Sequence, residues 1–340
     1  MIERLLTNAQ ALRRWRRFKR NKRAVVSCWV LGCLLVLSAT AEIWVNNKPL
    51  ILRYQSKMYY PAFTYYHPTV FGRQELLQMD YRSLQLSAGD WALWPLIRWD
   101  PLERNDNVAA WPSAPTTVNL MGTDASGRDV LTRLLYGFRY SVAFAFSVWL
   151  FSSVLGIIIG AIMGYFGALI DLFGQRCLEV FESMPYFLLL ITLIAIFSPN
   201  VFWLILLNTI FGWMGICQYM RGEMLKLRQR EFVEAARAYG ASTLRIVFKH
   251  CLMNGLTPWL TLSPFMLSGL ISTLAALDYL GFGLPPPTPS WGELFNQAQQ
   301  YFRIAWWLAL FPAGALFVTL LVLNMIGEGV RAALDPRASS

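Results

Sequence analysis

The sequence has few charged residues and only two histidines. Charged residues make up 15% of the 340 residues, whereas about 25% is usual for a soluble domain. His67 and His250 lie far apart in the chain, which argues against a histidine-based metal site. The five cysteines form no Cys-x-x-Cys pair and lie in or beside apolar stretches, so they indicate neither a disulfide framework nor a zinc site. We therefore expect no metal to be bound.

Two signatures of catalysis are also missing. No Gly-x-x-x-x-Gly-Lys-Ser/Thr stretch occurs, and this is the loop that cradles nucleotide phosphates. We expect the chain to bind no cofactor, so any ATP and Mg²⁺ must be held by a separate ATPase. Asp124, Arg128 and Asp129 have no positioned nucleophile and base around them. We interpret them as structural, with Asp129 near the N-terminus of a helix whose dipole favours an acid, and we predict no catalytic residue.

Apolar residues are abundant and gathered into long blocks. They make up 56% of the chain, and a block of about 20 residues is long enough to cross a bilayer as a helix. The blocks predict transmembrane helices at 24–45, 140–165, 178–197, 201–219, 255–280 and 304–326. The predicted fold class is therefore all-α, an integral membrane protein with six transmembrane helices. The first block shows no clear cleavage site, so we interpret it as an uncleaved anchor.

Basic residues predict how the chain is oriented. Residues 1–23 carry nine Lys or Arg beside the first block, which places the N-terminus in the cytoplasm. Six crossings then return the tail, 331–340, to the cytoplasm. Residues 46–120 fall outside the cytoplasm and are rich in Trp and Pro, so we expect a small extracytoplasmic segment there. The net charge of +10 suits this topology and anionic lipid headgroups better than nucleic acid.

Small residues and one proline should shape two of the helices. Gly156, Gly160 and Gly164 recur every four residues, a spacing that lets helices approach closely in lipid. Pro185 should kink the helix at 178–197 or begin its regular part.

The polar stretch 221–254 predicts two helices joined by a glycine. Good helix formers fill 229–239, and Phe232, Val233, Ala236 and Tyr239 form one stripe. Glu234 and Arg237 are spaced to pair at i, i+3. Gly240 suits the left-handed position that ends a helix, and Ser242 or Thr243 can cap the next. The result is a helix–Gly–helix elbow between two spans.

The residues of this elbow resemble a known motif. Glu234-Ala235-Ala236, followed after three residues by Gly240, is similar to the EAA motif of ABC importer permeases, and its surroundings look like the dipeptide and oligopeptide branch. The resemblance implies the type I ABC importer permease fold, with a core at 121–330. It also implies that the elbow docks on the ATPase and transmits its movement to the membrane helices. The coupling residues carried over are Phe232, Glu234, Ala235, Ala236, Arg237 and Gly240.

Four more segments support this resemblance. Gly122–Asp129 resembles the segment before helix 2 of the second permease subunit in peptide importers. Leu280–Gly283, with Pro287–Gly292 after it, looks like the loop between helices 5 and 6. Ser183–Pro185 falls at the helix-3 proline, and Leu334–Arg337 is similar to the C-terminal tail. Among such permeases the chain looks most like those of the microcin C and oligopeptide importers.

The resemblance implies the following function and partners. The chain would be the permease subunit of an ATP-driven importer of peptides or peptide-like compounds in the bacterial inner membrane. It would pair with a second, homologous permease and with two ATPase domains in one chain or two. A periplasmic or lipid-anchored solute-binding protein would deliver substrate. The alternatives are a secondary, ion-coupled transporter, which needs intramembrane charges, and a membrane enzyme.

The chain departs from the family pattern at three positions. Met253 stands where proline often follows the second elbow helix, so the helix break there should be softer. Leu274 replaces a glutamate near the end of helix 5, and Asp278 stands at a serine position. A carboxylate near a membrane interface either caps local backbone or meets substrate. We therefore hold Asp278 as a candidate residue of the substrate path.

Overall fold

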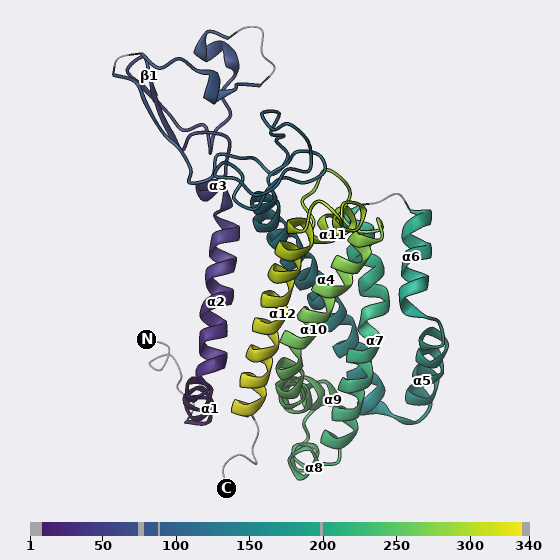
Figure 1. The fold of residues 1–340 in the computed structure, drawn as a ribbon. Helices are drawn as coiled ribbons and strands as arrows, with labels where there is room; N and C mark the ends of the chain where they lie inside the picture. Colours follow the sequence, from purple (N-terminus) through teal and green to yellow (C-terminus); the bar gives the residue numbers. More distant parts are fainter. Residues whose placement is uncertain (1–8, 74–77, 88, 198–199, 335–340) are drawn as a thin grey trace. The chain divides into compact units, whose positions relative to one another are not determined.

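The computed structural model describes residues 9–73, 78–87, 89–197 and 200–334 (Figure 1). The tail motif beyond residue 334 and the turn at 198–199 lie outside these residues. The chain forms two compact units. Unit 1 comprises Met1–Leu31, Ser141–Pro285 and Leu316–Ser340, and unit 2 comprises Gly32–Tyr140 and Pro286–Ala315.

Helices make up most of the structure. They are α1 (Ala9–Arg20), α2 (Lys22–Ala39), α3 (Ala41–Trp44), α4 (Val130–Phe166), α5 (Ala168–Glu182), α6 (Tyr186–Ile196), α7 (Val201–Leu227), α8 (Glu231–Ala238), α9 (Thr243–Arg245), the π-helical η4 (Ile246–Leu252), α10 (Met253–Tyr279), α11 (Trp291–Gln300) and α12 (Trp307–Leu334). Unit 2 adds the short strands β1 (Ile51–Tyr54), β2 (Lys57–Tyr59) and β3 (Trp91–Leu93), and the 3₁₀ turns η2 (Pro68–Phe71) and η3 (Tyr81–Ser83).

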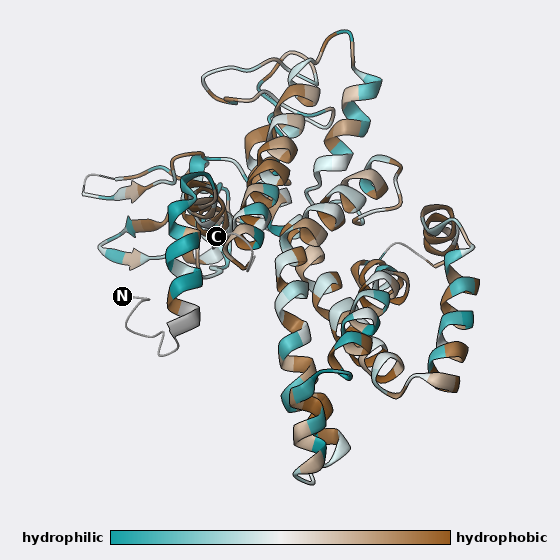
Figure 2. Cartoon of the chain, turned by 90° about the horizontal axis from the view of Figure 1, so that it is seen from below, coloured by the Kyte–Doolittle hydropathy of each residue, from teal (hydrophilic) through white to brown (hydrophobic). Residues whose placement is uncertain are grey.

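Within the described ranges, up to six segments are long and apolar enough to cross a membrane. Five are long and apolar enough alone, namely α2, α4, α7, the continuous rod Thr243–Tyr279 and α12. Helices α5 and α6 pass the same test as a pair and count as a sixth span if they cross together. In Figure 2 the hydrophobic colour dominates the long helices, whereas hydrophilic residues run along the helix next to the N-terminus. The predicted all-α, multi-pass membrane fold is confirmed.

The third predicted helix, 178–197, is divided into two helices next to Pro185. Helix α5 begins at Ala168 and ends at Glu182, and α6 then leaves at an angle of 73°. Pro185 occupies the N-cap position of α6. An N–H at the start of a helix has no partner within that helix, so proline costs no hydrogen bond there. The proline therefore begins the regular part of the second helix, which was one of the two roles expected of it.

Several other helices extend beyond the apolar blocks that predicted them. Helix α4 begins at Val130 rather than near Tyr140, and α7 continues to Leu227 instead of ending at 219. Helix α12 covers Trp307–Leu334 rather than 304–326, and the first block is divided into α2 and α3. Hydropathy ends where charged side chains begin, but backbone hydrogen bonding continues through them. The predicted loop 221–254 accordingly starts and ends inside helices.

A small antiparallel sheet lies in the segment between the first two spans. Strand β1 is central, with Leu52 opposite Tyr59 of β2 and Ala92 of β3. Beside it Phe71 is surrounded by tyrosine rings at centroid distances of 5.1–5.6 Å. Such edge-to-face aromatic packing stabilises a core too small to rely on aliphatic side chains. The all-α prediction did not include this sheet.

The core of unit 1 is formed by α4, α6, α7 and α10. Its fully buried side chains include Leu190, Leu204, Leu274 and Leu277. Many other large apolar side chains of these helices are exposed, as expected for a surface that faces lipid. Leu274 therefore has a packing role at the position where the family usually has glutamate.

Candidate functional site

The elbow predicted from the sequence is present and has the expected stop signal. Helix α8 ends at the C-cap residue Tyr239, and Gly240 has φ +74°. The Gly240 N–H donates to the Arg237 carbonyl and the Ala241 N–H to the Ala236 carbonyl, both at 3.0 Å. These two bonds form a Schellman motif, which requires a left-handed residue where Gly240 lies. Because glycine has no Cβ, this position has a specific chemical reason to be glycine.

One face of the elbow is anchored in unit 1. Val233 is fully buried and packs with Met220 and Met224 of α7 and with Ile246 and Cys251 of η4. Ala236 is partly buried against the same cluster. The elbow is therefore in direct side-chain contact with two membrane-spanning segments. A displacement of α8 must move this cluster or unpack it.

The other face carries the remaining motif residues. Glu234, Ala235 and Arg237 are exposed, and Tyr239 is 92% exposed. The apolar stripe predicted from the sequence is thus wrong in part, because Phe232 and Tyr239 point outward while Val233 and Ala236 point inward. The exposed face carries Arg237 and Tyr239, and arginine and tyrosine are two of the residue types enriched at protein–protein interfaces.

Glu234 and Arg237 do not pair with each other. In the portion of the chain that the structure describes, neither side chain forms an ion pair. An exposed pair at i, i+3 contributes only about 0.2–0.5 kcal/mol, so solvation competes with it easily. Both charges are therefore available to a partner.

The second arm of the elbow joins α10 without a break. Ser242 occupies the N-cap position of α9 but makes no side-chain capping bond, and the π-helical turns of η4 lead directly into Met253. The softer exit expected from Met253 is confirmed as a continuous helix. Leu244 and Phe248 are exposed on this arm, so apolar surface continues beyond Gly240.

Close packing links α7 to α4 above the elbow. A Cβ at Gly156, Gly160 or Gly164 would overlap backbone oxygens or side chains of α7, so the predicted role of these glycines is confirmed. Next to Gly164, Arg221 of α7 also donates a hydrogen bond from Nη2 to Asp171 of α5 at 2.7 Å. The helices that contact Val233 are therefore part of a tightly packed bundle and not a loose one.

Asp278 lies at the opposite end of α10 from the elbow and is buried. Its carboxylate accepts a hydrogen bond from the Leu284 N–H at 2.6 Å. Gly281 has φ +82°, and a Cβ at Gly283 would overlap the carboxylate. Asp278 thus holds the turn after α10, which is the capping role weighed in the sequence analysis.

The acidic and basic residues before α4 form a buried network in unit 2. Asp124 accepts from Arg128 Nε at 2.7 Å, and Arg128 Nη2 donates to Glu293 at 2.6 Å. Arg133 is 0% exposed and also binds Glu293. Asp129 accepts from the Thr132 N–H at the start of α4, and burial raises the pKa of its carboxyl. The structural interpretation of this group is consistent with these contacts.

The sequence did not predict that Glu293 joins this network. Glu293 follows Ser290, which caps α11 through its side chain, and it lies more than 150 residues from its arginine partners. A buried arginine pair needs a nearby acid, but sequence separation hides which one. No group of three or more His, Cys, Asp or Glu side chains in the described ranges is placed to hold a metal ion.

Comparison with protein families identifies the class. The model for the binding-protein-dependent transport system inner membrane component matches residues 156–340, and that for the N-terminal TM domain of oligopeptide transport permease C matches residues 10–68. The first covers more than half of the chain. The chain therefore belongs to the binding-protein-dependent ABC importer permeases, and it is a multi-pass inner-membrane protein. This membership sets aside the secondary transporter.

Individual relatives narrow the class further. The inner membrane ABC transporter permease protein YejE of Escherichia coli (strain K12) is 40% identical over 329 residues, which cover 95% of this chain and 96% of that protein. The peptidoglycan transport system permease protein YejE of Agrobacterium fabrum (strain C58 / ATCC 33970) is 37% identical, covering 96% and 92%. The oligopeptide transport system permease protein OppC of Haemophilus influenzae (strain ATCC 51907 / DSM 11121 / KW20 / Rd) is 37% identical, covering 66% and 73%.

Proposed function

We propose that this permease imports peptides or peptide-like compounds and that α8 couples it to separate ATPases. The observation that carries the proposal is the two-faced elbow, anchored inside by Val233 and exposed outside at Glu234, Arg237 and Tyr239. Binding energy at interfaces concentrates in aromatic and arginine side chains. Tyr239 and Arg237 supply both on one short helix.

Coupling would work through rigid contact. The ATPase would hold the exposed face of α8, and ATP-driven closure of two ATPase domains would push Val233 against α7 and η4. Because a packed cluster does not compress, the push would move the spans and reverse access. ATP and Mg²⁺ belong to the ATPase, so this chain would itself catalyse no reaction.

The substrate class follows from the relatives. Their names refer to peptidoglycan and oligopeptide transport, and these compounds share peptide bonds. We extend that class to this chain, with microcin C-type modified peptides as one member. A second, homologous permease would complete the pathway, and a periplasmic or lipid-anchored solute-binding protein would deliver the substrate.

Both termini would lie in the cytoplasm. Helix α1 carries basic residues through its last turn and precedes α2 by one residue. Positive charge beside a span favours the cytoplasmic side and attracts anionic lipid headgroups. On this orientation α8 faces the cytoplasm, where an ATPase can reach it.

The coupling proposal is tested in proteoliposomes that contain the complete importer. Gly240→Pro or Glu234→Lys should abolish uptake and substrate-stimulated ATP hydrolysis while the chain still inserts. Asp106→Lys reverses an exposed charge in unit 2 and should leave both activities unchanged. Normal substrate-stimulated ATP hydrolysis in the elbow variants would refute the coupling role.

Asp278 has a separate test. Its carboxylate already accepts a backbone hydrogen bond, but a substrate ammonium group could share it. If Asp278 lies on the substrate path, Asp278→Asn should shift the preference between substrates with free and acetylated amino termini. Uptake with unchanged rate and preference would remove Asp278 from the path and leave it with the capping role.

A further inference from the structure

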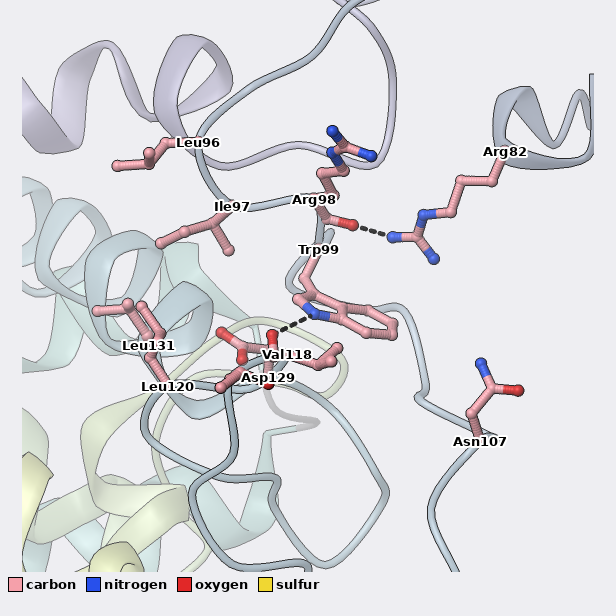
Figure 3. Close-up of a pocket in the computed structure, with 11 residues that line it drawn as sticks. Arg82, Leu96, Ile97, Arg98, Trp99, Asn107, Val118, Leu120, Asp129 and Leu131 are labelled. Carbon is pink, nitrogen blue, oxygen red and sulfur yellow. Dashed lines mark hydrogen bonds between the residues drawn. The ribbon is translucent and has the colours of Figure 1, made fainter.

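A cavity of about 380 Å³ opens in unit 2, in the segment between the first two spans. Figure 3 shows Leu96, Ile97, Leu120 and Leu131 along one side of it, with Arg82 and Asn107 opposite. No coupling or capping role described above uses this cavity.

The cavity lies at the ends of two membrane-spanning helices. The Ile97 N–H donates to the Trp44 carbonyl at 3.0 Å, and Trp44 is the last residue of the helix that continues the first span. Leu131 belongs to the first turn of α4. One wall is thus joined to the end of the first span and another to the beginning of the second, which sets the cavity at a membrane boundary.

Its apolar wall is exposed to an unusual degree. Leu96 is 84% exposed, and Val118 and Leu120 are about 60% exposed. Three large apolar side chains around one opening are unfavourable against water, and contiguous patches of this kind mark contact surfaces. Trp44 is also exposed beside them, and tryptophan is enriched where a protein meets the bilayer interface. The Trp44 carbonyl is bonded to Ile97, the neighbour of Leu96, so the patch adjoins the helix that continues the first span.

The polar side offers one available cation. Arg82 is occupied by Glu103, at 2.7 Å, and lies over the Trp99 ring. Asp129 is occupied by Thr132 and Asn119. Arg98 is exposed and lies over the Trp94 ring at 5.2 Å, and no acidic partner for it occurs in the described ranges. The cavity thus has an apolar wall, and Figure 3 shows the exposed, unneutralised Arg98 side chain extending outward beside it.

We propose that this cavity binds a membrane glycerophospholipid. The phosphate would accept hydrogen bonds from Arg98, because guanidinium groups match phosphate oxygens in geometry and charge. The glycerol and the first methylene groups of an acyl chain would lie against Leu96, Ile97, Leu120 and Leu131. The proposed orientation makes this an outer-leaflet lipid, but the binding chemistry does not depend on that orientation or on transport.

The test uses the full chain purified in mild detergent and washed free of loosely held lipid. Phosphatidylglycerol is added back, and bound lipid is counted by native mass spectrometry. The unmodified chain should retain phosphatidylglycerol, whereas Arg98→Gln and Leu96→Asp should each weaken its binding about tenfold, since each removes one recognition element. Inorganic phosphate should not compete, because it lacks the apolar part.

Matched controls separate this site from general lipid contact. Arg53→Gln and Leu93→Asp change exposed residues of the same unit that do not line the cavity, and they should bind lipid like the unmodified chain. Equal binding by the cavity variants and the unmodified chain would overturn the proposal. Equal losses of lipid binding in the control variants would overturn it as well. So would the finding that a solute-binding protein needs Leu96 in order to dock but displaces no lipid, because Leu96 would then belong to a protein contact. Failed transport with normal lipid binding would count against the proposed function alone.

Discussion

Two regions of this chain contain similar residues and use them in opposite ways. Around α4 and α11, Arg133 and Asp124 are fully buried and are paired within unit 2. On α8, Glu234 and Arg237 are exposed. Each region also has a glycine with positive φ, Gly127 or Gly240. Buried charges stabilise a fixed arrangement only when each is paired, whereas exposed charges remain available to another protein. The first region is suited to rigidity and the second to recognition.

The largest expected effect comes from breaking the buried network. Arg133→Gln leaves Asp124 and Glu293 short of a cation, and breaking a buried ion pair costs about 3–5 kcal/mol. The variant should lose thermal stability in detergent and should accumulate poorly in the membrane. Arg237→Gln should change stability by less than about 0.5 kcal/mol, because its side chain is exposed. Thermal unfolding of the two purified variants side by side measures the difference, and similar losses would break the comparison.

A smaller difference should appear between the two glycines. A Cβ at Gly127 would overlap the Trp111 ring, whereas at Gly240 it would meet nothing within 4 Å. Gly240→Ala should therefore cost only left-handed backbone strain, about 1–2 kcal/mol. Gly127→Ala adds overpacking and should cost about 2–4 kcal/mol in total. Chemical or thermal denaturation of both variants orders them, and a costlier Gly240→Ala would show that α8 is more constrained than its exposure indicates.

The smallest expected effect concerns the Arg139–Glu42 ion pair, whose side chains are partly exposed. Arg139 Nη1 donates to Glu42 Oε1 at 2.8 Å, and this hydrogen bond lowers the pKa of the Glu42 carboxyl. A lowered folded-state pKa contributes stability above the unfolded pKa, and the contribution is lost as pH falls through the folded value. The stability difference between the unmodified chain and Glu42→Gln should therefore shrink below about pH 4. A constant difference from pH 7 to pH 3 would show that the pair contributes nothing.

Sequence reasoning succeeded where the chemistry is local. Helix α8 ends before Gly240 because that glycine adopts a positive φ, and helix α6 begins after Pro185 because proline has no N–H. The glycine row on α4 predicted close packing because four-residue spacing places small residues on one face. The prediction that Phe232 lies on the buried stripe was wrong. Phe232 and Val233 are adjacent in sequence and about 100° apart around the helix, so the apolar pattern alone cannot tell which of them is buried. Only contact with Met220 and Ile246 shows that Val233 is the buried residue of the two.

The sequence by itself determined that this chain spans a membrane, roughly which segments cross it, and that the first elbow helix ends before Gly240. Those properties depend on the length of apolar blocks and on the backbone preferences of single residues, which neighbours in space do not change. The tertiary structure decided which charges are paired and which remain available. Glu293 binds Arg133, which lies 160 positions away in the sequence. Asp278 accepts a hydrogen bond from the Leu284 N–H. Arg98 has no acidic partner in the described ranges. Such pairings depend on how distant segments pack, because the free energy of a charge is set by its surroundings in space.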